Sequence, residues 1–81
     1  MEKRVGVVGI VIEDFDVVDK VNERLHEHAD IIVGRMGVPY KDKGISVISL
    51  IVDGTMDNIS SLTGQLGKIE GLKVKSAITK K

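Results

Sequence analysis

The fold of this protein is decided by residues 4–12, which read RVGVVGIVI, together with residues 44–52, which read GISVISLIV. Both runs are rich in β-branched residues, which favour β-strands. In each run, apolar side chains occupy odd and even positions alike, so both faces of the strand are hydrophobic. A strand of that kind is buried on both sides. We therefore expect both runs to lie in the middle of a sheet that is covered on its two faces.

Two weaker apolar runs are expected at the edges of the same sheet. Residues 30–40 are interrupted by glycines, and Pro39 near their end cannot donate a hydrogen bond to a neighbouring strand. Residues 72–79 alternate apolar and polar side chains, and Lys73 and Lys75 on the polar side discourage pairing with a further strand. The polar residues 40–44 end in glycine and suit a hairpin turn between the second and third runs.

Two amphipathic segments lie between the strand-like runs and are expected to be helices. The first follows the acidic residues 13–16, where Asp14 or Asp16 can cap free backbone N–H groups. The second follows residues 53–55, which read as a turn with Thr55 as the cap. Each has an apolar stripe with three- and four-residue spacings. The stripes comprise Val17, Val18, Val21, Leu25 and His28 in the first helix and Met56, Ile59, Leu62, Leu66 and Ile69 in the second.

The elements follow the order strand–helix–strand–strand–helix–strand. Short connections and right-handed crossovers then favour an α+β fold of the ferredoxin-like βαββαβ type, a sandwich in which a four-stranded antiparallel sheet carries two helices on one face. In this fold the first and third strands are central and the second and fourth are edges, in agreement with the hydrophobic patterns. We expect residues 1–81 to form this single domain. Met36 and Met56 are expected to fill gaps in its core.

Two helices can cover only one face of such a sheet, so the second apolar face of the central strands needs another cover. We expect a second copy of the chain to supply it, which makes the protein a homodimer or homotetramer assembled through the sheet face. An alternative is a scaffold whose exposed sheet docks onto another polypeptide and which binds no ligand.

Composition limits the remaining functions. The 12 basic and 12 acidic residues leave no net field to attract nucleic acid or an anionic membrane. The chain contains no cysteine, which excludes disulfides and thiolate metal sites and fits a reducing compartment. The longest apolar run, residues 5–12, is far shorter than the roughly 20 residues that span a bilayer, and no secretory signal precedes it. We expect a soluble cytoplasmic protein that contacts neither nucleic acid nor membrane.

Neither enzyme activity nor a cofactor is expected, because no serine lies near a histidine in the sequence that could act as its base. Other proteins of this fold class also fail to match. A heavy-metal carrier needs a Cys-x-x-Cys motif, and an RNA-recognition domain carries aromatic side chains on its strands. An acylphosphatase-like enzyme needs an arginine where this chain has the acidic residues 13–16.

A small-ligand site is expected where two copies meet. The first turn can bind a cation or accept hydrogen bonds from an amino group, although the same residues also suit a simple capping turn at a helix start. The second strand of a neighbouring copy would supply the opposite wall. The candidate residues are Glu13, Asp14, Phe15 and Asp16 in the first turn and Met36, Val38 and Tyr40 in the second strand.

The only imidazoles, His26 and His28, are the candidate metal ligands. Residues two apart on a helix do not share a face, so the pair can chelate a metal only if the helix has already ended. We therefore expect solvated or partly packed histidines near the end of a helix, where they complement the helix dipole.

Three features resemble known regulatory families. The order and lengths of the elements resemble ACT and ACT-like domains, which bind small ligands at sheet-mediated subunit interfaces. Residues 25–30, LHEHAD, and residues 44–54, GISVISLIVDG, look like the histidine-rich run and the third strand of the ligand-sensing half of nickel-responsive repressors. Residues 52–55, VDGT, in a short chain that begins at its first strand, are similar to the stand-alone regulators associated with iron-only hydrogenase systems.

The resemblance implies a non-enzymatic regulatory or sensor-like module that binds a small effector as a homo-oligomer, in the last family a regulator of an iron-only hydrogenase system. Residues 37–39 stand where the nickel repressors have His-x-His, and Ile45 stands where they have cysteine, so their square-planar nickel site is not implied. Residues 15–16 replace the proline-glycine usual in the first loop of ACT domains. A divalent-metal sensor of the nickel type that uses His26 and His28 is the remaining alternative.

Overall fold

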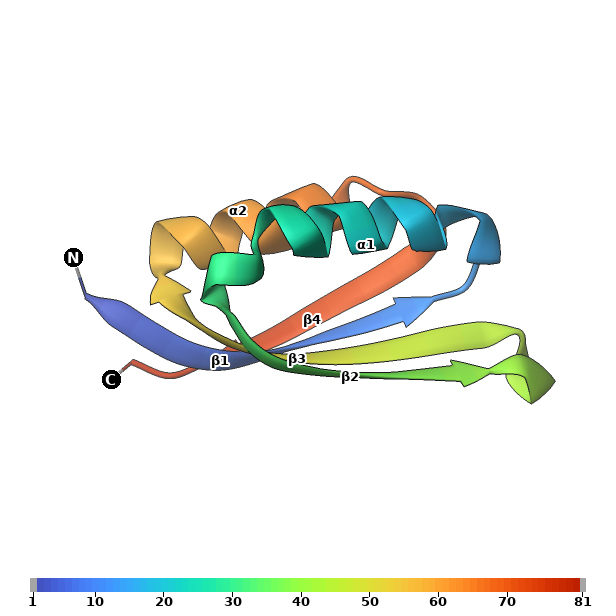
Figure 1. Cartoon of the computed structure of the whole chain (residues 1–81), viewed down its shortest axis with the longest axis horizontal. Coiled ribbons are helices and arrows are strands. Elements are labelled where there is room, and N and C mark those ends of the chain that lie inside the picture. Colours follow the sequence, from blue (N-terminus) through green and yellow to red (C-terminus); the bar gives the residue numbers. More distant parts are fainter. Residues whose placement is uncertain (1, 81) are drawn as a thin grey trace.

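The computed structural model describes residues 2–80 and contains one four-stranded sheet and two α-helices (Figure 1). The strands are β1 (Lys3–Ile12), β2 (Ile32–Tyr40), β3 (Ile45–Thr55) and β4 (Leu72–Ile78), and the helices are α1 (Val18–Glu27) and α2 (Met56–Gly67). Short 3-10 turns cover Phe15–Val17, Ala29–Ile31 and Lys41–Lys43. Within the described part of the chain, no helix is long and apolar enough to cross a membrane.

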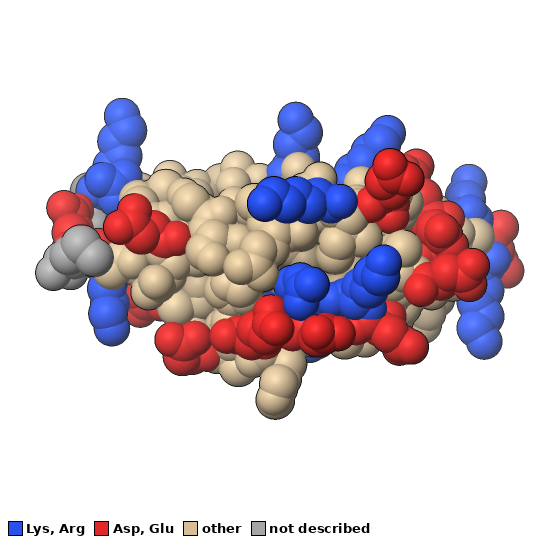
Figure 2. Space-filling model, turned by 90° about the horizontal axis from the view of Figure 1, so that it is seen from above, with Lys and Arg blue, Asp and Glu red and all other residues tan. Residues whose placement is uncertain are grey.

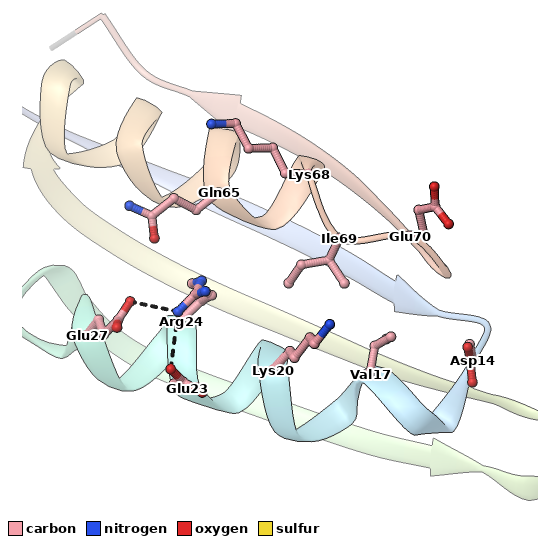
Figure 3. Close-up of a pocket in the computed structure, with 10 residues that line it drawn as sticks. All are labelled: Asp14, Val17, Lys20, Glu23, Arg24, Glu27, Gln65, Lys68, Ile69 and Glu70. Carbon is pink, nitrogen blue, oxygen red and sulfur yellow. Dashed lines mark hydrogen bonds and ion pairs between the residues drawn. The ribbon is translucent and has the colours of Figure 1, made fainter.

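The sheet confirms the expected ferredoxin-like arrangement. Its strand order is β2-β3-β1-β4 and every neighbouring pair is antiparallel, so the doubly apolar strands β1 and β3 are central. Both helices lie on one side of the sheet, with α1 toward β2 and α2 toward β4 (Figures 1 and 3). The hairpin between β2 and β3 closes at Gly44, whose φ of 67° is left-handed and favours glycine.

The core fills the space between the helices and one face of the sheet. Alternate residues of the two central strands point into it and meet the apolar stripes of the helices, as their spacing predicted. The buried side chains are Val8, Ile10 and Ile12 of β1, Ile48, Leu50 and Val52 of β3, Val21 and Leu25 of α1, Ile59, Leu62 and Leu66 of α2, and Ile31.

The end of β3 differs from the sequence-based expectation. Residues 53–55 were predicted to form a turn, but they continue the strand, because β1 begins at Lys3 and offers them a partner: Lys3 pairs with Thr55 and Val5 with Asp53. Gly54 between them is buried, and an added Cβ there would lie 2.9 Å from the side chain of Ile31. Thr55 is the helix cap as predicted, since its Oγ1 accepts a hydrogen bond from the Asn58 N–H at 3.2 Å.

The methionines also differ from expectation. Met36 and Met56 were predicted to fill the core, but their side chains are 66% and 37% exposed. Met36 lies on the edge strand and pairs with Ser49, which places it on the sheet face opposite the helices. Met56 is the first residue of α2, and the buried residues of this helix begin at Ile59. Ile69 packs against the core from beyond the end of α2 rather than from within the helix.

Both edges of the sheet are modified against further pairing. In β2, the register with β3 shifts between Ile32 and Gly34, which forms a bulge, and Pro39 lacks an N–H group. The strand begins at Ile32, later than expected, because Ala29–Ile31 form a 3-10 turn. β4 carries Lys73 and Lys75 as exposed residues.

The first turn is held against the loop before β4. The backbone N–H groups of Glu13 and Asp14 both donate to the carbonyl oxygen of Gly71, at 2.7 and 3.1 Å. Gly71 has a φ of 92°, and an added Cβ would lie 2.7 Å from the Cβ of Asp14. Only glycine fits this position without strain.

We therefore expect Gly71→Ala to lower the free energy of unfolding by about 1–3 kcal/mol, the cost of a side chain in a strained left-handed conformation. The matched control is Gly64→Ala in α2, where an added Cβ meets nothing within 4 Å. That change is expected to raise stability by about 0.5–1 kcal/mol, because alanine is the better helix former. Urea denaturation of both variants measures the difference, and equal effects would contradict the strain at Gly71.

Candidate functional site

The sheet face opposite the helices is uncovered in the described part of the chain (Figure 1). Odd-numbered residues of β1 and β3 point to this side, because their even-numbered neighbours are in the core. We call this surface the open face. The strand register arranges its side chains in three adjacent rows. These rows are Val38–Val47–Val11–Lys73, Met36–Ser49–Gly9–Lys75 and Gly34–Ile51–Val7–Ala77.

The open face is mostly apolar over three strands, with the exposed carboxylate of Asp53 beside Val5 at one end, and it is basic along the fourth. Val7 and Ile51 on the central strands are 44% and 42% exposed, and Val38 on β2 is 47% exposed. Lys73 and Lys75 of β4 end two of the rows and place positive charge along that edge of the face. A contiguous hydrophobic surface of this kind is typical of an interaction site.

The first turn is a capping structure in a single chain. Asp14 Oδ1 accepts a hydrogen bond from the Asp16 backbone N–H at 2.9 Å, so Asp14 caps the 3-10 turn that leads into α1. This was one of the two capping residues predicted. Glu13 and Phe15 are exposed, and the Phe15 ring is 46% exposed although it is a large apolar group.

One chain does not bring the two predicted walls of the ligand site together. Ile12 pairs with Ser46 and Tyr40 pairs with Ile45, so the first turn and the end of β2 lie at the same end of the sheet. However, β3 lies between β1 and β2 and separates them. Met36, Val38 and Tyr40 are all exposed. The predicted site therefore needs two copies of the chain, and it stays a prediction.

His28 joins the two helices. Its Nδ1 lies 2.8 Å from the carbonyl oxygen of Arg24, which can only accept, so Nδ1 carries the proton and donates. Its Nε2 lies 3.3 Å from the Ser61 Oγ in α2. His26 instead lines a pocket between α1 and β2. The two histidines therefore lie in different places and do not face a common site. Among residues 2–80, no group of three or more His, Cys, Asp or Glu is placed to hold a metal ion.

A charged groove of about 920 Å³ runs between α1 and α2 (Figure 3). Acidic and basic side chains alternate along it, and on the helical face of the molecule acidic side chains form a row along one long edge with basic side chains beside it (Figure 2). Arg24 is already paired there with Glu23 at 3.4 Å and Glu27 at 3.2 Å. The mixed charge of the groove does not select a ligand of either sign.

Sequence reasoning missed one polar contact that links α1 to the sheet. Arg35 lies within residues 30–40, the second predicted strand. In the structure its Nη2 donates to Asn22 Oδ1 of α1 at 3.1 Å. Arg35 pairs with the core residue Leu50, which places it on the helix side of the edge strand, and the sequence alone carries no signal for that side.

We expect His28→Ala to lower the free energy of unfolding by about 1 kcal/mol, because it removes the hydrogen bond to Arg24 in α1 and the one to Ser61 that ties α1 to α2. His26→Ala is the matched control and is expected to change stability by less than about 0.5 kcal/mol, as is usual for an exposed residue. Thermal and urea unfolding of both variants measure the difference. If His26→Ala proved the more costly change, the assignment of His28 as the link between the helices would be wrong.

Comparison with known proteins agrees with this architecture. The solved structure of the uncharacterized protein TM1266 from Thermotoga maritima is 36% identical in sequence, with a TM-score of 0.92, and the match covers 98% of this chain and 100% of that one. The nitrogen regulatory PII-like protein CPII from Thiomonas intermedia K12, solved with ADP, AMP and bicarbonate, is 13% identical with a TM-score of 0.51 over 98% of this chain and 99% of that one.

The divalent ion tolerance protein CutA1 from Ehrlichia chaffeensis is 11% identical, with a TM-score of 0.50 over 100% of this chain and 86% of that one. At such identities, CPII and CutA1 share only the fold with this chain. None of the curated proteins matches its sequence. The model of the TM1266-like family, described as an iron-only hydrogenase system regulator, matches residues 4–76, which is nearly the whole chain. The chain therefore belongs to the TM1266-like family of iron-only hydrogenase system regulators.

Proposed function

We propose that this chain is a regulatory protein without catalytic activity of its own. It associates with a second copy through the open face and binds a small effector where the two copies meet. The observation that carries the proposal is the apolar surface left exposed on the central strands, at Val5, Val7 and Ile51. The description of the family as regulators of a hydrogenase system supports the regulatory role.

Covering the open face is energetically favourable. Each large aliphatic side chain contributes about 1.5–3 kcal/mol when it passes from full exposure to full burial, and Val7, Val38 and Ile51 on the open face are 42–47% exposed. Association costs entropy, and one such side chain cannot offset that cost. Several of them in adjacent rows can offset it if they are buried together. A second copy of the sheet offers a surface of the same size and pattern.

The charges on β4 favour one way of stacking the two sheets. A two-fold axis parallel to the strands places β4 of each copy over β2 of the other and β3 over β1. The aliphatic stems of Lys73 and Lys75 then lie on Val38 and Met36 of the partner copy, and their ammonium groups reach water at the rim. An axis across the strands would stack β4 on β4 and bring like charges together. Sheets stacked face to face cross at about 30° because each is twisted.

This stacking also assembles the proposed effector site. The axis keeps each row at the same height along the strands, so Tyr40 of one copy comes over the residues just before β4 of the other, at Gly71, which is hydrogen-bonded to the first turn. Glu13 and Asp16 would then accept hydrogen bonds from a ligand that carries an amino group, between the rings of Phe15 and Tyr40. Such a ligand regulates by stabilising one geometry of the assembly over another.

We expect light scattering after size exclusion to find a dimer or a tetramer, and Ile51→Glu to dissociate it. An unpaired charge buried in an interface costs about 3–5 kcal/mol. The dissociation constant should therefore rise by at least about 100-fold.

Met56→Glu is the control for this experiment, because Met56 is similarly exposed but lies at the start of α2, away from the open face. It should leave the assembly unchanged. Ile51→Thr, which keeps a β-branched residue, guards against loss of the fold and should weaken association less than Ile51→Glu. If light scattering found the unsubstituted protein to be a monomer, self-association would be refuted and the scaffold alternative favoured.

We further expect one compound in a panel of amino acids and nucleotides to raise the melting temperature. A ligand at ten times its Kd adds about 1.4 kcal/mol of stability, which corresponds to roughly 6–11 °C for a domain of this size. Phe15→Ala and Tyr40→Ala should each abolish the response, whereas Met56→Ala should not. Native mass spectrometry then gives the stoichiometry. A melting temperature that no compound alters would refute the effector site but not the assembly.

A further inference from the structure

A second pocket, of about 570 Å³, lies within one chain between α1 and β2. Its wall is apolar at Leu25 and Ile32, and Asn22, His26 and Arg35 contribute the polar side chains. Among the described residues that line it, none is acidic. This distinguishes it from the groove between the helices, whose lining includes several carboxylates.

The three polar side chains converge for reasons of local geometry. Asn22 and His26 are four residues apart on α1, so they lie on the same side of that helix. Arg35 pairs with the core residue Leu50, which places Arg35 on the helix side of β2. The bulge between Ile32 and Gly34 takes Val33 out of register beside the pocket, and bulges commonly re-aim neighbouring side chains.

The guanidinium group of Arg35 is left with unused donors. It donates one hydrogen bond, from Nη2 to Asn22 Oδ1 at 3.1 Å. Within residues 2–80 the ion pairs involve Arg24 and not Arg35, so no carboxylate of the described chain neutralises the charge of Arg35. Asn22 uses its Oδ1 for Arg35, which leaves its side-chain NH2 group free to donate to a ligand.

We propose that this pocket binds the oxyanion of a small organic acid. The fork of Arg35 donates to both oxygens of the anion, as guanidinium groups do with carboxylates and phosphates. The amide of Asn22 and the imidazole of His26 donate from α1, and a short alkyl chain packs against Leu25 and Ile32. The site lies in a single chain and does not depend on the dimer proposed above.

The test is a titration of the ¹⁵N-labelled full chain, followed by NMR at constant pH and ionic strength. The probes are 3-methylbutanoate, acetate and inorganic phosphate. We expect 3-methylbutanoate to shift the Gly34 amide, the Asn22 side-chain amide and the Arg35 Nε–H signal along one saturating curve. Acetate should bind at least about fivefold more weakly, because it lacks the alkyl chain that covers the apolar wall. Tighter binding of phosphate than of 3-methylbutanoate would overturn the assignment to an organic acid, because the apolar wall would then contribute nothing to binding.

Arg35→Gln should abolish the saturating shifts of the Gly34 and Asn22 signals. Arg35→Lys, which keeps the charge but loses the fork, should weaken binding at least about tenfold. Arg4→Gln is the matched control, because it removes the same charge from a residue that does not line this pocket, and it should leave the affinity unchanged. The proposal is overturned if no probe gives a saturating shift, or if the Arg35 and Arg4 variants respond alike.

Discussion

The two central strands carry apolar side chains on both faces, and the rest of the structure depends on how those faces are covered. On one side, Val8, Ile10 and Leu50 meet the stripes of α1 and α2 and form the core. Those two helices account for all the α-helical structure of residues 2–80, and they lie on the same side of the sheet. On the other side, no element of the described chain covers the sheet (Figure 1), and Val7 and Ile51 are exposed there. The domain thus has a complete core on one face of the sheet and an exposed surface, also rich in aliphatic side chains, on the other.

Local details hold the layers in place. The loop at Gly71 accepts two backbone hydrogen bonds from the first turn, which fixes the start of α1 relative to β4. Thr55 caps α2 directly where β3 ends, and His28 links the end of α1 to the middle of α2. Each of these contacts is polar and lies outside the core, so the layers are positioned by hydrogen bonds as well as by apolar packing.

The sequence predicted the fold well because its strongest signals are periodic. Alternation in β1 and β3 and the helical spacing of Val21, Leu25 and Ile59 depend only on which face of an element is buried. The end of β3 was mispredicted because Asp53-Gly54 reads locally as a turn, whereas pairing with β1 extends the strand. Tertiary contacts of this kind outweigh local turn preference.

The candidate sites were harder to predict for a related reason. The capping role of Asp14 follows from its position before a helix, so it could be anticipated. The contact between Arg35 and Asn22 could not, because it joins residues of different elements whose proximity depends on the packing of α1 against the edge of the sheet. The exposure of Met36 likewise depends on which face of β2 it occupies, and the bulge at Val33 resets that alternation.

The modified edges of the sheet have a consequence for the size of any assembly. The bulge and Pro39 on β2, and the lysines of β4, oppose the addition of a foreign strand at either side. Growth by continuous strand addition, the route to fibres, is therefore disfavoured at both ends of the strand order. Layers stacked on a single hydrophobic face are self-limiting, because each added copy consumes the surface that attracted it.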